Sequence, residues 1–323
     1  MFNLTIVITN QTLRHLLAKV FPQRQIAAVE PLPGGLINTN LRIDFQSNYD
    51  PVVLRLYRDG ADVCRKEIAV DNLIQSEVPV PKILYAEPNP VDDIPSFAIL
   101  EFIDGLTFQQ LKRTSDVEAI RQASRSVGET LAAIGRFRFP KSGRLVVEGA
   151  SEQLSVGASF IEGPDPIPRL LDTFLESQDC QNRAGANLVE RIHNFTWTWA
   201  DQIPNLDAPP SLVHCDFGNR NILVREENGK WIVAAVLDWE FALSGSPLLD
   251  VGHFLRYETD DRPLREPHFS KAFVEHGGYL PEGWREIVRV IDLTALVECL
   301  THDYLPAEVE SELIELIVTT LES

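Results

Sequence analysis

The residues of this chain that could do chemistry are concentrated in residues 214–221, which read HCDFGNRN. His214 supplies an imidazole, Asp216 a carboxylate and Asn221 an amide within one short loop. A second carboxylate, Asp238, follows seventeen residues after Asn221, in the sequence DWE. A carboxylate can accept a proton, and carboxylate and amide oxygens suit a hard cation such as Mg²⁺. This stretch therefore predicts a site that combines a base with metal ligands.

A β-hairpin is predicted to position these groups. Residues 221–225 and 231–239 are strand-like, and between them lies an Asn-Gly pair, which favours a tight hairpin turn. Asn221 and Asp238 lie nearly symmetrically about this turn, so both are expected at the open end of the hairpin. Asp216 lies in the loop that leads into it. The hairpin is thus expected to gather two carboxylates and an amide oxygen at one point.

The part of the chain before residue 104 reads as a small α+β unit. Leu41, Ile43 and Phe45 alternate with polar residues, which is the period of a half-buried strand. The segment 62–75 instead repeats its apolar residues with the 3.6-residue period of a helix. In all, strands are predicted at 25–32, 39–45 and 52–57 and in the sequences VPVPKILYAE and FAILEFI. The expected architecture is one helix packed on an antiparallel sheet.

After residue 104 the chain reads as mainly helical. A capping box of Ser115 and Glu118 precedes an apolar stripe that runs to about residue 137. Residues 140–166 are rich in Gly, Pro and Ser and are predicted to form an irregular connection. Further helices are predicted at 168–177, 186–203, 284–300 and 307–321. We therefore expect an α+β fold in two parts, residues 1–104 and residues 105–323.

Taken in order, these motifs resemble the aminoglycoside phosphotransferase family, which is distantly related to the protein kinases. The loop HCDFGNRN matches that family's His-x-Asp-x-x-x-x-Asn, and DWE matches its metal-binding Asp. Other segments follow the family's order from about residue 31 to 256: PLPGGLINTNLRI, VVLRLYR, CRKEIAVDNLI, VPVPKIL, ILEFIDG and GSPLLDVGHFLR. Choline kinase, homoserine kinase and fructosamine kinase are relatives. The resemblance implies a two-lobe protein-kinase-like fold, with a small antiparallel-sheet N-lobe for the nucleotide and a larger helical C-lobe.

The resemblance assigns roles to the residues around the loop. Asp216 is the expected base, which orients the acceptor hydroxyl or takes its proton. Asn221 and Asp238 are expected to bind Mg²⁺ that bridges the phosphates of ATP. His214 and Asp250 are expected to support the loop through hydrogen bonds. For Asp216, Asn221, Asp238 and Asp250 the simpler alternative is a structural role in capping turns and strand ends. For His214 the alternative to the supporting role is a direct part in the chemistry.

The resemblance also implies a nucleotide site made by Gly34, Gly35, Arg55, Glu67, Glu101 and Ile103. The two glycines would let the backbone approach the phosphates, although Gly-Gly also suits an ordinary turn. Arg55 stands where kinase-like strands usually have Lys, and it is expected to pair bidentately with Glu67 and to touch phosphate. An exposed Arg and a solvated Glu are the alternatives. Glu101 and Ile103 fall in the hinge, where backbone groups would meet adenine.

The charge of the chain restricts its partners. The formal net charge is −18, so a nucleic-acid partner is not expected. Residues 1–104 hold 9 basic and 13 acidic residues, and residues 105–323 hold 20 and 34, so the second part carries most of the negative charge. This mildly favours an amine-bearing small-molecule acceptor, such as an aminoglycoside, choline or an amino sugar. The cluster Glu258, Asp260 and Asp261 is interpreted as a solvated face, with capture of substrate amines as the alternative.

The cysteines indicate a reducing compartment. Cys64, Cys180, Cys215 and Cys299 have no paired spacing, which disfavours a disulfide framework or a zinc module. The first residues lack a basic leader, and no apolar run approaches the roughly 18 residues of a membrane span. We therefore expect a cytoplasmic protein without a membrane partner. Cys215 is not expected to act as a nucleophile, because a neighbouring His in the sequence does not by itself make a dyad.

Two other functions remain open. A nucleotide-binding regulator without turnover would be expected to lack Asp216 or Asp238, and both are present. A metal-dependent hydrolase would use His214, Asp216 and Asp238 as ligands and would need another histidine, for which His253 is the candidate. The glycine hairpin and the predicted ion pair have no role in that chemistry. The sequence favours an ATP- and Mg²⁺-dependent kinase that acts on a hydroxyl of a small molecule, with GTP as the alternative donor.

Overall fold

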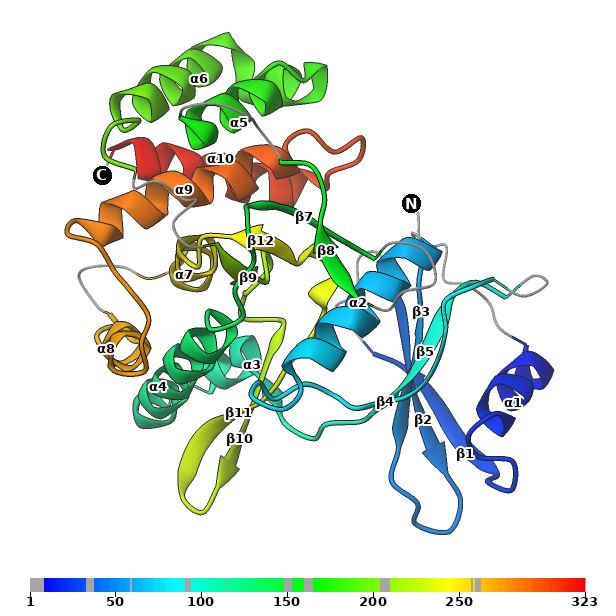
Figure 1. The fold of residues 1–323 in the computed structure, drawn as a ribbon. Coiled ribbons are helices and arrows are strands. Elements are labelled where there is room, and N and C mark those ends of the chain that lie inside the picture. Colours follow the sequence, from blue (N-terminus) through cyan, green and yellow to red (C-terminus); the bar gives the residue numbers. More distant parts are fainter. Residues whose placement is uncertain are drawn as a thin grey trace.

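A computed structural model describes residues 9–32, 38–58, 60–90, 94–114, 116–147, 153–159, 165–203, 210–256, 258 and 263–322. Gly34, Gly35, Asp260 and Asp261 lie outside these residues. Figure 1 shows a sheet with two helices beside a larger, mainly helical part. No described helix has the length and apolar character that crossing a membrane requires.

Five antiparallel strands form the sheet of the first part, in the order β1-β2-β3-β5-β4. They are β1 (Ile26–Pro31), β2 (Thr39–Phe45), β3 (Val52–Leu56), β4 (Ile83–Glu87) and β5 (Phe97–Glu101). These strands and helix α2 (Ala61–Ile74) fall on the predicted segments. Helix α1 (Asn10–Ala18) is not among the predicted elements, and its buried face of Leu13, Leu16 and Leu17 packs on the core of this sheet.

Helices dominate the second part, as predicted. The predicted helices correspond to α4 (Val117–Ile134), α5 (Pro166–Leu175), α6 (Gln178–Thr198), α9 (Trp284–Cys299) and α10 (Ala307–Glu322). Helix α4 begins one residue later than its predicted capping box implies. Its N-cap is Asp116, whose carboxylate accepts a hydrogen bond from the backbone N–H of Ala119 at 3.0 Å.

Several short helices and strands of the second part are not predicted from the sequence. The hairpin itself is present as β10 (Ile222–Glu227) and β11 (Lys230–Val236). The elements that were not predicted are β6 (Leu106–Thr107), α3 (Phe108–Arg113), β7 (Gly143–Val147), β8 (Leu154–Val156), β12 (Leu243–Gly245), α7 (Leu248–Leu255) and α8 (His268–Glu275). Strand β9 (Ser211–Val213) falls on the apolar run SLV, which is predicted to be a buried strand that leads into the loop of Asp216. The expected irregular connection over 140–166 is wrong in part, because β7 and β8 pair there. They extend a sheet of order β8-β7-β12-β9, so distant residues stabilise these short strands.

The chain passes from the first sheet to the second part between β5 and β6. Strand β6 pairs with β10, so the chain joins the hairpin sheet directly after this connection. The division after residue 104, which we propose from the sequence, falls in the same connection.

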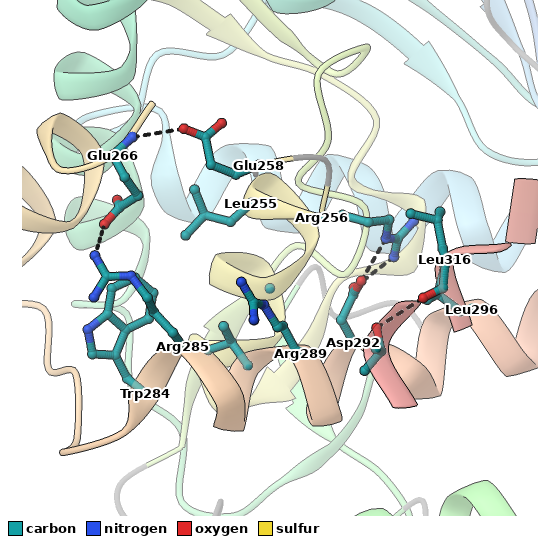
Figure 2. Close-up of a pocket in the computed structure, with 13 residues that line it drawn as sticks. Leu255, Arg256, Glu258, Glu266, Trp284, Arg285, Arg289, Asp292, Leu296 and Leu316 are labelled. Atoms are coloured by element: carbon teal, nitrogen blue, oxygen red, sulfur yellow. Dashed lines mark hydrogen bonds and ion pairs between the residues drawn. The ribbon is translucent and has the colours of Figure 1, made fainter. Parts of the chain in front are cut away.

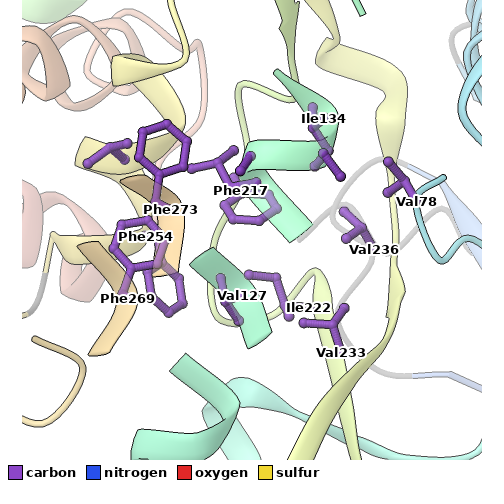
Figure 3. Packing of buried hydrophobic residues seen from close by; sticks show 14 of the residues in the cluster. Val78, Val127, Ile134, Phe217, Ile222, Val233, Val236, Phe254, Phe269 and Phe273 are labelled. Carbon is purple, nitrogen blue, oxygen red and sulfur yellow. The ribbon is translucent and has the colours of Figure 1, made fainter. Parts of the chain in front are cut away.

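The main core cluster packs α4 against the hairpin and against α7 and α8. Figure 3 shows Phe217 beside Phe254 and Phe269, and Ile222 of the same cluster next to Val127. The ring centroids of Phe254 lie 6.2 Å from Phe217 and 4.8 Å from Phe269. Phe217 directly follows Asp216, and Ile222 begins β10. Burial of this core therefore fixes the backbone on both sides of the chemistry-bearing loop.

Candidate active site

The β10–β11 hairpin brings the candidate metal ligands to one end. Both residues of its turn, 228–229, have positive φ, as an Asn-Gly hairpin turn requires. At the open end, the backbone N–H of Leu237 donates to the carbonyl oxygen of Asn221 at 2.8 Å. The structure therefore places Asn221 next to the segment that carries Asp238, which is the arrangement predicted from the symmetry of the sequence about the turn.

The amide of Asn221 holds Asp216. Its Nδ2 lies 2.6 Å from Oδ2 of Asp216 and 3.0 Å from the backbone oxygen of the same residue. Both of these partners are acceptors, so the amide nitrogen faces Asp216 and Oδ1 of Asn221 faces away. The Asp216 side chain is still 39% exposed, so a substrate can reach it. Burial raises the pKa of Asp216 to about 6, the hydrogen bond from Asn221 opposes the rise, and the charge of Asp238 adds to it.

His214 is buried and uses both of its ring nitrogens within the fold. Its Nε2 donates to the carbonyl oxygen of Leu237 at 2.9 Å, and its Nδ1 accepts from the backbone N–H of Asp216 at 3.2 Å. Burial lowers the pKa of His214 to about 4, so the ring is neutral at pH 7. With both nitrogens engaged by the backbone, His214 has none left for a metal ion. This argues against the metal-dependent hydrolase.

Asp250 supports the same loop from helix α7. Its two carboxylate oxygens accept the backbone N–H groups of His214 and Cys215 at 2.7 and 2.9 Å. These bonds hold Cys215 in a left-handed conformation with φ of 66°. Burial raises the pKa of Asp250 to about 7 and raises the pKa of the Cys215 thiol well above its ordinary value. A protonated thiol is a poor nucleophile, which agrees with the expectation for Cys215.

A buried arginine links Asp238 to the first sheet. Nη2 of Arg55 on β3 lies 2.5 Å from Oδ1 of Asp238, and Nε lies 3.1 Å from Oε2 of Glu67 on α2. The side chains of Arg55 and Glu67 are only 6% and 7% exposed. The predicted bidentate pair is not formed, because the guanidinium is shared between two carboxylates. Burial disfavours the charged guanidinium, but Glu67 and then Asp238 outweigh it and raise the pKa of Arg55.

Two further hydrogen bonds join the first part to the DWE motif. The backbone N–H of Trp239 donates to Oε1 of Glu67 at 3.1 Å, and Nδ2 of Asn38 donates to Oε2 of Glu240 at 2.8 Å. Burial, and then the charge of Asp238, raise the pKa of Glu240 to about 7. Sequence reasoning did not single out Asn38 or Glu240. The place of Glu240 inside DWE is the signal that could have identified it.

The other nucleotide-site candidates lie near the crossing between the two parts, apart from Gly34 and Gly35, which fall outside the described residues. Glu101 ends β5, and its backbone N–H donates to the carbonyl oxygen of Lys82 at 2.9 Å. Ile103 is half-buried between β5 and β6, and its backbone takes part in no hydrogen bond with another described residue. The N–H of Glu101 is thus already used within the fold, whereas both backbone groups of Ile103 can serve a ligand.

The donor set at the hairpin fits a Mg²⁺ ion that is shared with phosphates. Oδ1 of Asn221 faces away from Asp216, and Asp238 has a second carboxylate oxygen besides the one that contacts Arg55. Mg²⁺ at phosphoryl-transfer sites is usually held by one or two carboxylates together with substrate phosphates and water. Within the described part of the chain, no group of three or more His, Cys, Asp and Glu side chains forms a metal site on its own. Asn221 and Asp238 therefore suit a metal ion that arrives with the nucleotide.

A pocket lies between α7, α9 and α10, and Figure 2 shows that two of its carboxylates, Asp292 and Glu266, are paired with arginines. Asp292 contacts Nε and Nη2 of Arg256 at 2.7 Å each, and Glu266 contacts Arg285 at 2.8 Å. These carboxylates are already paired with arginines, so they are poorly available to bind a cationic ligand in this pocket. The preference for an amine-bearing acceptor thus rests on the net charge of the second part alone.

Glu258 is a structural carboxylate rather than part of a solvated face. It accepts hydrogen bonds from the backbone N–H groups of residues 264–266 and from the guanidinium of Arg265. Its side chain is only 11% exposed. The interpretation as a solvated cluster is therefore wrong for this residue, and the capture of amines by Glu258 is not supported either, since protein donors occupy its oxygens.

Replacing Arg55 tests the buried ion pair. Arg55→Leu is expected to lower the free energy of unfolding by about 3 to 5 kcal/mol, because it leaves the buried Glu67 carboxylate without its cation. The matched control is Arg125→Leu, which also removes an arginine that contacts two carboxylates, Glu129 and Glu275, but is 50% exposed. Its expected cost is at most about 1 kcal/mol. Urea unfolding of both variants decides the point, and equal losses would contradict the assigned burial of Arg55.

Comparison with known proteins identifies one family. Residues 28–287 match the model of the phosphotransferase enzyme family. This span contains all the candidate site residues named above, from Gly34 to Asp250.

Solved structures share the fold. The aminoglycoside phosphotransferase APH(4)-Ia, in a ternary complex with AMP-PNP and hygromycin B, aligns with a TM-score of 0.67 at 19% identity, over 96% of this chain and 98% of that one. A putative fructosamine-3-kinase from Thermobifida fusca YX-ER1 aligns with a TM-score of 0.62 at 18% identity, over 96% and 99%. The predicted α+β, two-lobe kinase-like fold is confirmed by these alignments. At such identities the likeness establishes the fold, and the site must be argued from its own residues.

Curated relatives match over part of their length. The protein named acyl-CoA dehydrogenase family member 11 from Pongo abelii is 28% identical over 182 residues, which are 54% of this chain and 20% of that protein. The protein of the same name from Gallus gallus is 24% identical over 244 residues, which are 73% and 29%. The chain thus spans about a fifth to three tenths of the length of the curated relatives it matches.

Proposed function

The chain belongs to the phosphotransferase enzyme family. From this premise we propose that it is a small-molecule kinase, which transfers the γ-phosphoryl group of ATP, with Mg²⁺, to a hydroxyl of its acceptor. One observation carries the proposal. Two carboxylates at the end of the same hairpin have partners of different kinds: Asp216 is held by the neutral amide of Asn221, whereas Asp238 faces the guanidinium of Arg55. The first arrangement suits a base and the second suits a centre of phosphate and metal binding.

Asp216 is the proposed base. Its exposed carboxylate accepts the proton of the acceptor hydroxyl, or orients that hydroxyl, as the oxygen attacks the γ-phosphorus. Phosphoryl transfer depends mainly on positioning and charge neutralisation, so a carboxylate with a pKa of about 6 is basic enough at pH 7.5. His214 and Asp250 hold the loop that carries Asp216 and do not contact the reacting atoms.

Asn221 and Asp238 are the proposed Mg²⁺ ligands, and Arg55 is the proposed phosphate contact. When bound, Mg²⁺ would supply positive charge that neutralises the charge developing on the phosphates. Arg55 is held beside Asp238 by Glu67, so its guanidinium lies next to the place where phosphates and metal would meet. Gly34, Gly35, Glu101 and Ile103 remain proposed nucleotide contacts, the last two through their backbone.

The acceptor is proposed to be a small alcohol, and its class can be found with a panel. ADP release would be measured with Mg·ATP and, separately, Mg·GTP, against aminoglycosides, choline, homoserine, amino sugars and fructosyl amines. A hydroxylated acyl-CoA belongs in the panel as well, because the curated relatives carry an acyl-CoA dehydrogenase name. Acceptor-dependent ADP release supports the proposal and names the acceptor class. Binding of Mg·ATP without release for any acceptor would favour the regulator, and absence of nucleotide binding would overturn the proposal.

Removal of the metal ion should abolish turnover. In the same assay, excess EDTA is expected to lower ADP release to background, because Asn221 and Asp238 would then hold no cation to neutralise the charge of the phosphates. Readdition of Mg²⁺ should restore the rate, and Ca²⁺, which prefers more ligands at longer distances, should restore it poorly. Turnover that persists in EDTA at the original rate would contradict the assignment of Asn221 and Asp238.

A further inference from the structure

We propose that His253 is a positioning residue for Asp216, and that it acts by donating a hydrogen bond from Nε2 to Oδ1 of that carboxylate. The inference rests on the proposed function, because it assumes that Asp216 is the base. The Nε2 atom lies 3.2 Å from Oδ1 of Asp216, on the side away from Asn221, which holds Oδ2. Asn221 thus holds one oxygen of the carboxylate, the proposed hydrogen bond from His253 would hold the other, and lone pairs remain for the acceptor hydroxyl.

The other side of the imidazole fixes which nitrogen carries the proton. Nη2 of Arg256 lies 3.5 Å from Nδ1 of His253, and a guanidinium can only donate. Nδ1 is therefore the acceptor, and the proton of the neutral ring is on Nε2, facing Asp216. Burial, and then the charge of Arg256, lower the pKa of His253 to about 3, so the ring stays neutral and its role is to orient rather than to exchange protons.

Helix α9 anchors this arrangement. Arg256 is fixed by Asp292, which contacts Nε and Nη2 at 2.7 Å each. Figure 2 shows this pair at one wall of the pocket between α7, α9 and α10. The side chains of Arg256 and Asp292 are 12% and 8% exposed, so the pair is largely shielded from solvent. The positioning of Asp216 therefore depends on a chain of contacts that runs from α9 through Arg256 and His253.

The backbone around the pair is held by the aromatic core. His253 precedes Phe254, Asp216 precedes Phe217, and the two phenyl rings pack with centroids 6.2 Å apart. Gly218 makes room for the imidazole, because a Cβ at this position would come within 3.1 Å of Nε2. Catalytic hydrogen bonds in ligand-free enzymes are often long and shorten when the substrate binds. The distance of 3.2 Å between Nε2 of His253 and Oδ1 of Asp216 is consistent with such a bond.

Two amide substitutions separate positioning from packing. In His253→Gln the side-chain amide can reach the place of Nε2, whereas in the one-methylene-shorter His253→Asn it reaches only the place of Nδ1. We expect His253→Asn to lower kcat about 10- to 100-fold with an unchanged KM for ATP, because a misplaced base costs up to about that factor. His253→Gln should restore kcat to within a few-fold of the wild type. Equal losses in both variants, or wild-type kcat in His253→Asn, would overturn the proposal.

A second variant tests the chain of contacts without changing His253 itself. Asp292→Asn leaves His253 and Asp216 intact but weakens the clamp on Arg256, so it should lower kcat several-fold and add nothing in the His253→Asn background. Additive losses would mean that α9 acts separately from His253 and would contradict the proposed chain of contacts. Thermal unfolding of each variant shows whether the fold is retained. If the wild type shows no acceptor-dependent turnover, the proposed function fails and this inference fails with it. If the wild type turns over and His253→Asn is fully active, only this inference is rejected.

Discussion

Asp216→Asn is expected to lower kcat for acceptor phosphorylation by about 100- to 10,000-fold, the range that loss of a general base usually costs. Asparagine has nearly the same shape, and its amide oxygen can still accept the hydrogen bond from Asn221, so the loop should keep its conformation, although the NH2 group cannot accept from His253. What is lost is the ability to accept the proton and the full negative charge that orients the hydroxyl. The affinity for Mg·ATP should therefore stay within a few-fold of the wild type.

The control for this prediction is Asp201→Asn, an exposed aspartate in the same half of the chain. It makes the same chemical change and the same change in net charge, and it should leave kcat unaltered. Initial rates at saturating Mg·ATP, together with the thermal unfolding midpoint of each variant, give the comparison. If Asp216→Asn kept more than about a tenth of the wild-type kcat, a different group would have to be the base.

Asp238→Asn is expected to have an effect of similar size by a different route. We expect kcat to fall about 1,000-fold, because a neutral amide binds Mg²⁺ far less well than a carboxylate and the phosphate charge is then poorly neutralised. The side chain is 22% exposed and its partner Arg55 keeps Glu67, so the fold should be retained. The diagnostic result is the metal dependence: the Mg²⁺ concentration for half-maximal rate should rise strongly in Asp238→Asn and remain unchanged in Asp216→Asn.

This difference in metal dependence separates the two carboxylates. If both substitutions simply disrupted the structure of the site, the rate would fall and the Mg²⁺ dependence would change in both variants. An Asp238→Asn variant with the wild-type Mg²⁺ dependence would contradict the role assigned to Asp238, whatever its kcat. Titration of the rate with Mg²⁺ at fixed ATP is sufficient, with Asp201→Asn as the reference.

The core of the candidate site is predictable from the sequence because its geometry is local. The Asn-Gly turn sets the register of the hairpin near its tip, a bulge at Leu223 and Val224 shifts it by one residue, and Asn221 then lies beside the segment of Asp238. The five strands of the first sheet also have patterns that a short window can show, and they fall where they are predicted. The partners of Arg55 are less local. The expected pair with Glu67 exists, but Asp238, which is 183 residues away in the sequence, takes the other side of the guanidinium.

Contacts between distant segments account for what the sequence did not show. Strands β7 and β8 are short and lie in a segment rich in Gly, Pro and Ser, and they are stabilised by β12, about a hundred residues further along. His253 lies in the segment GSPLLDVGHFLR and is considered from the sequence only as a metal ligand, and its contact with Asp216 appears only once α7 is in place. Glu258 reads as part of an acidic surface, yet the backbone of residues 264–266 closes around it. In each case the decisive partner is fixed by tertiary packing.

The most direct test of the account is the transfer of label from γ-labelled Mg·ATP to the acceptor identified by the panel. The wild type, Asp216→Asn, Asp238→Asn and the control Asp201→Asn would be compared at equal protein concentration, with the phosphorylated acceptor isolated and counted. We predict that label appears in the acceptor for the wild type and for Asp201→Asn, and that it falls to near background for the two site variants. Label in the acceptor at the wild-type rate in Asp216→Asn or Asp238→Asn would contradict the central claim that these two carboxylates form a single phosphoryl-transfer site.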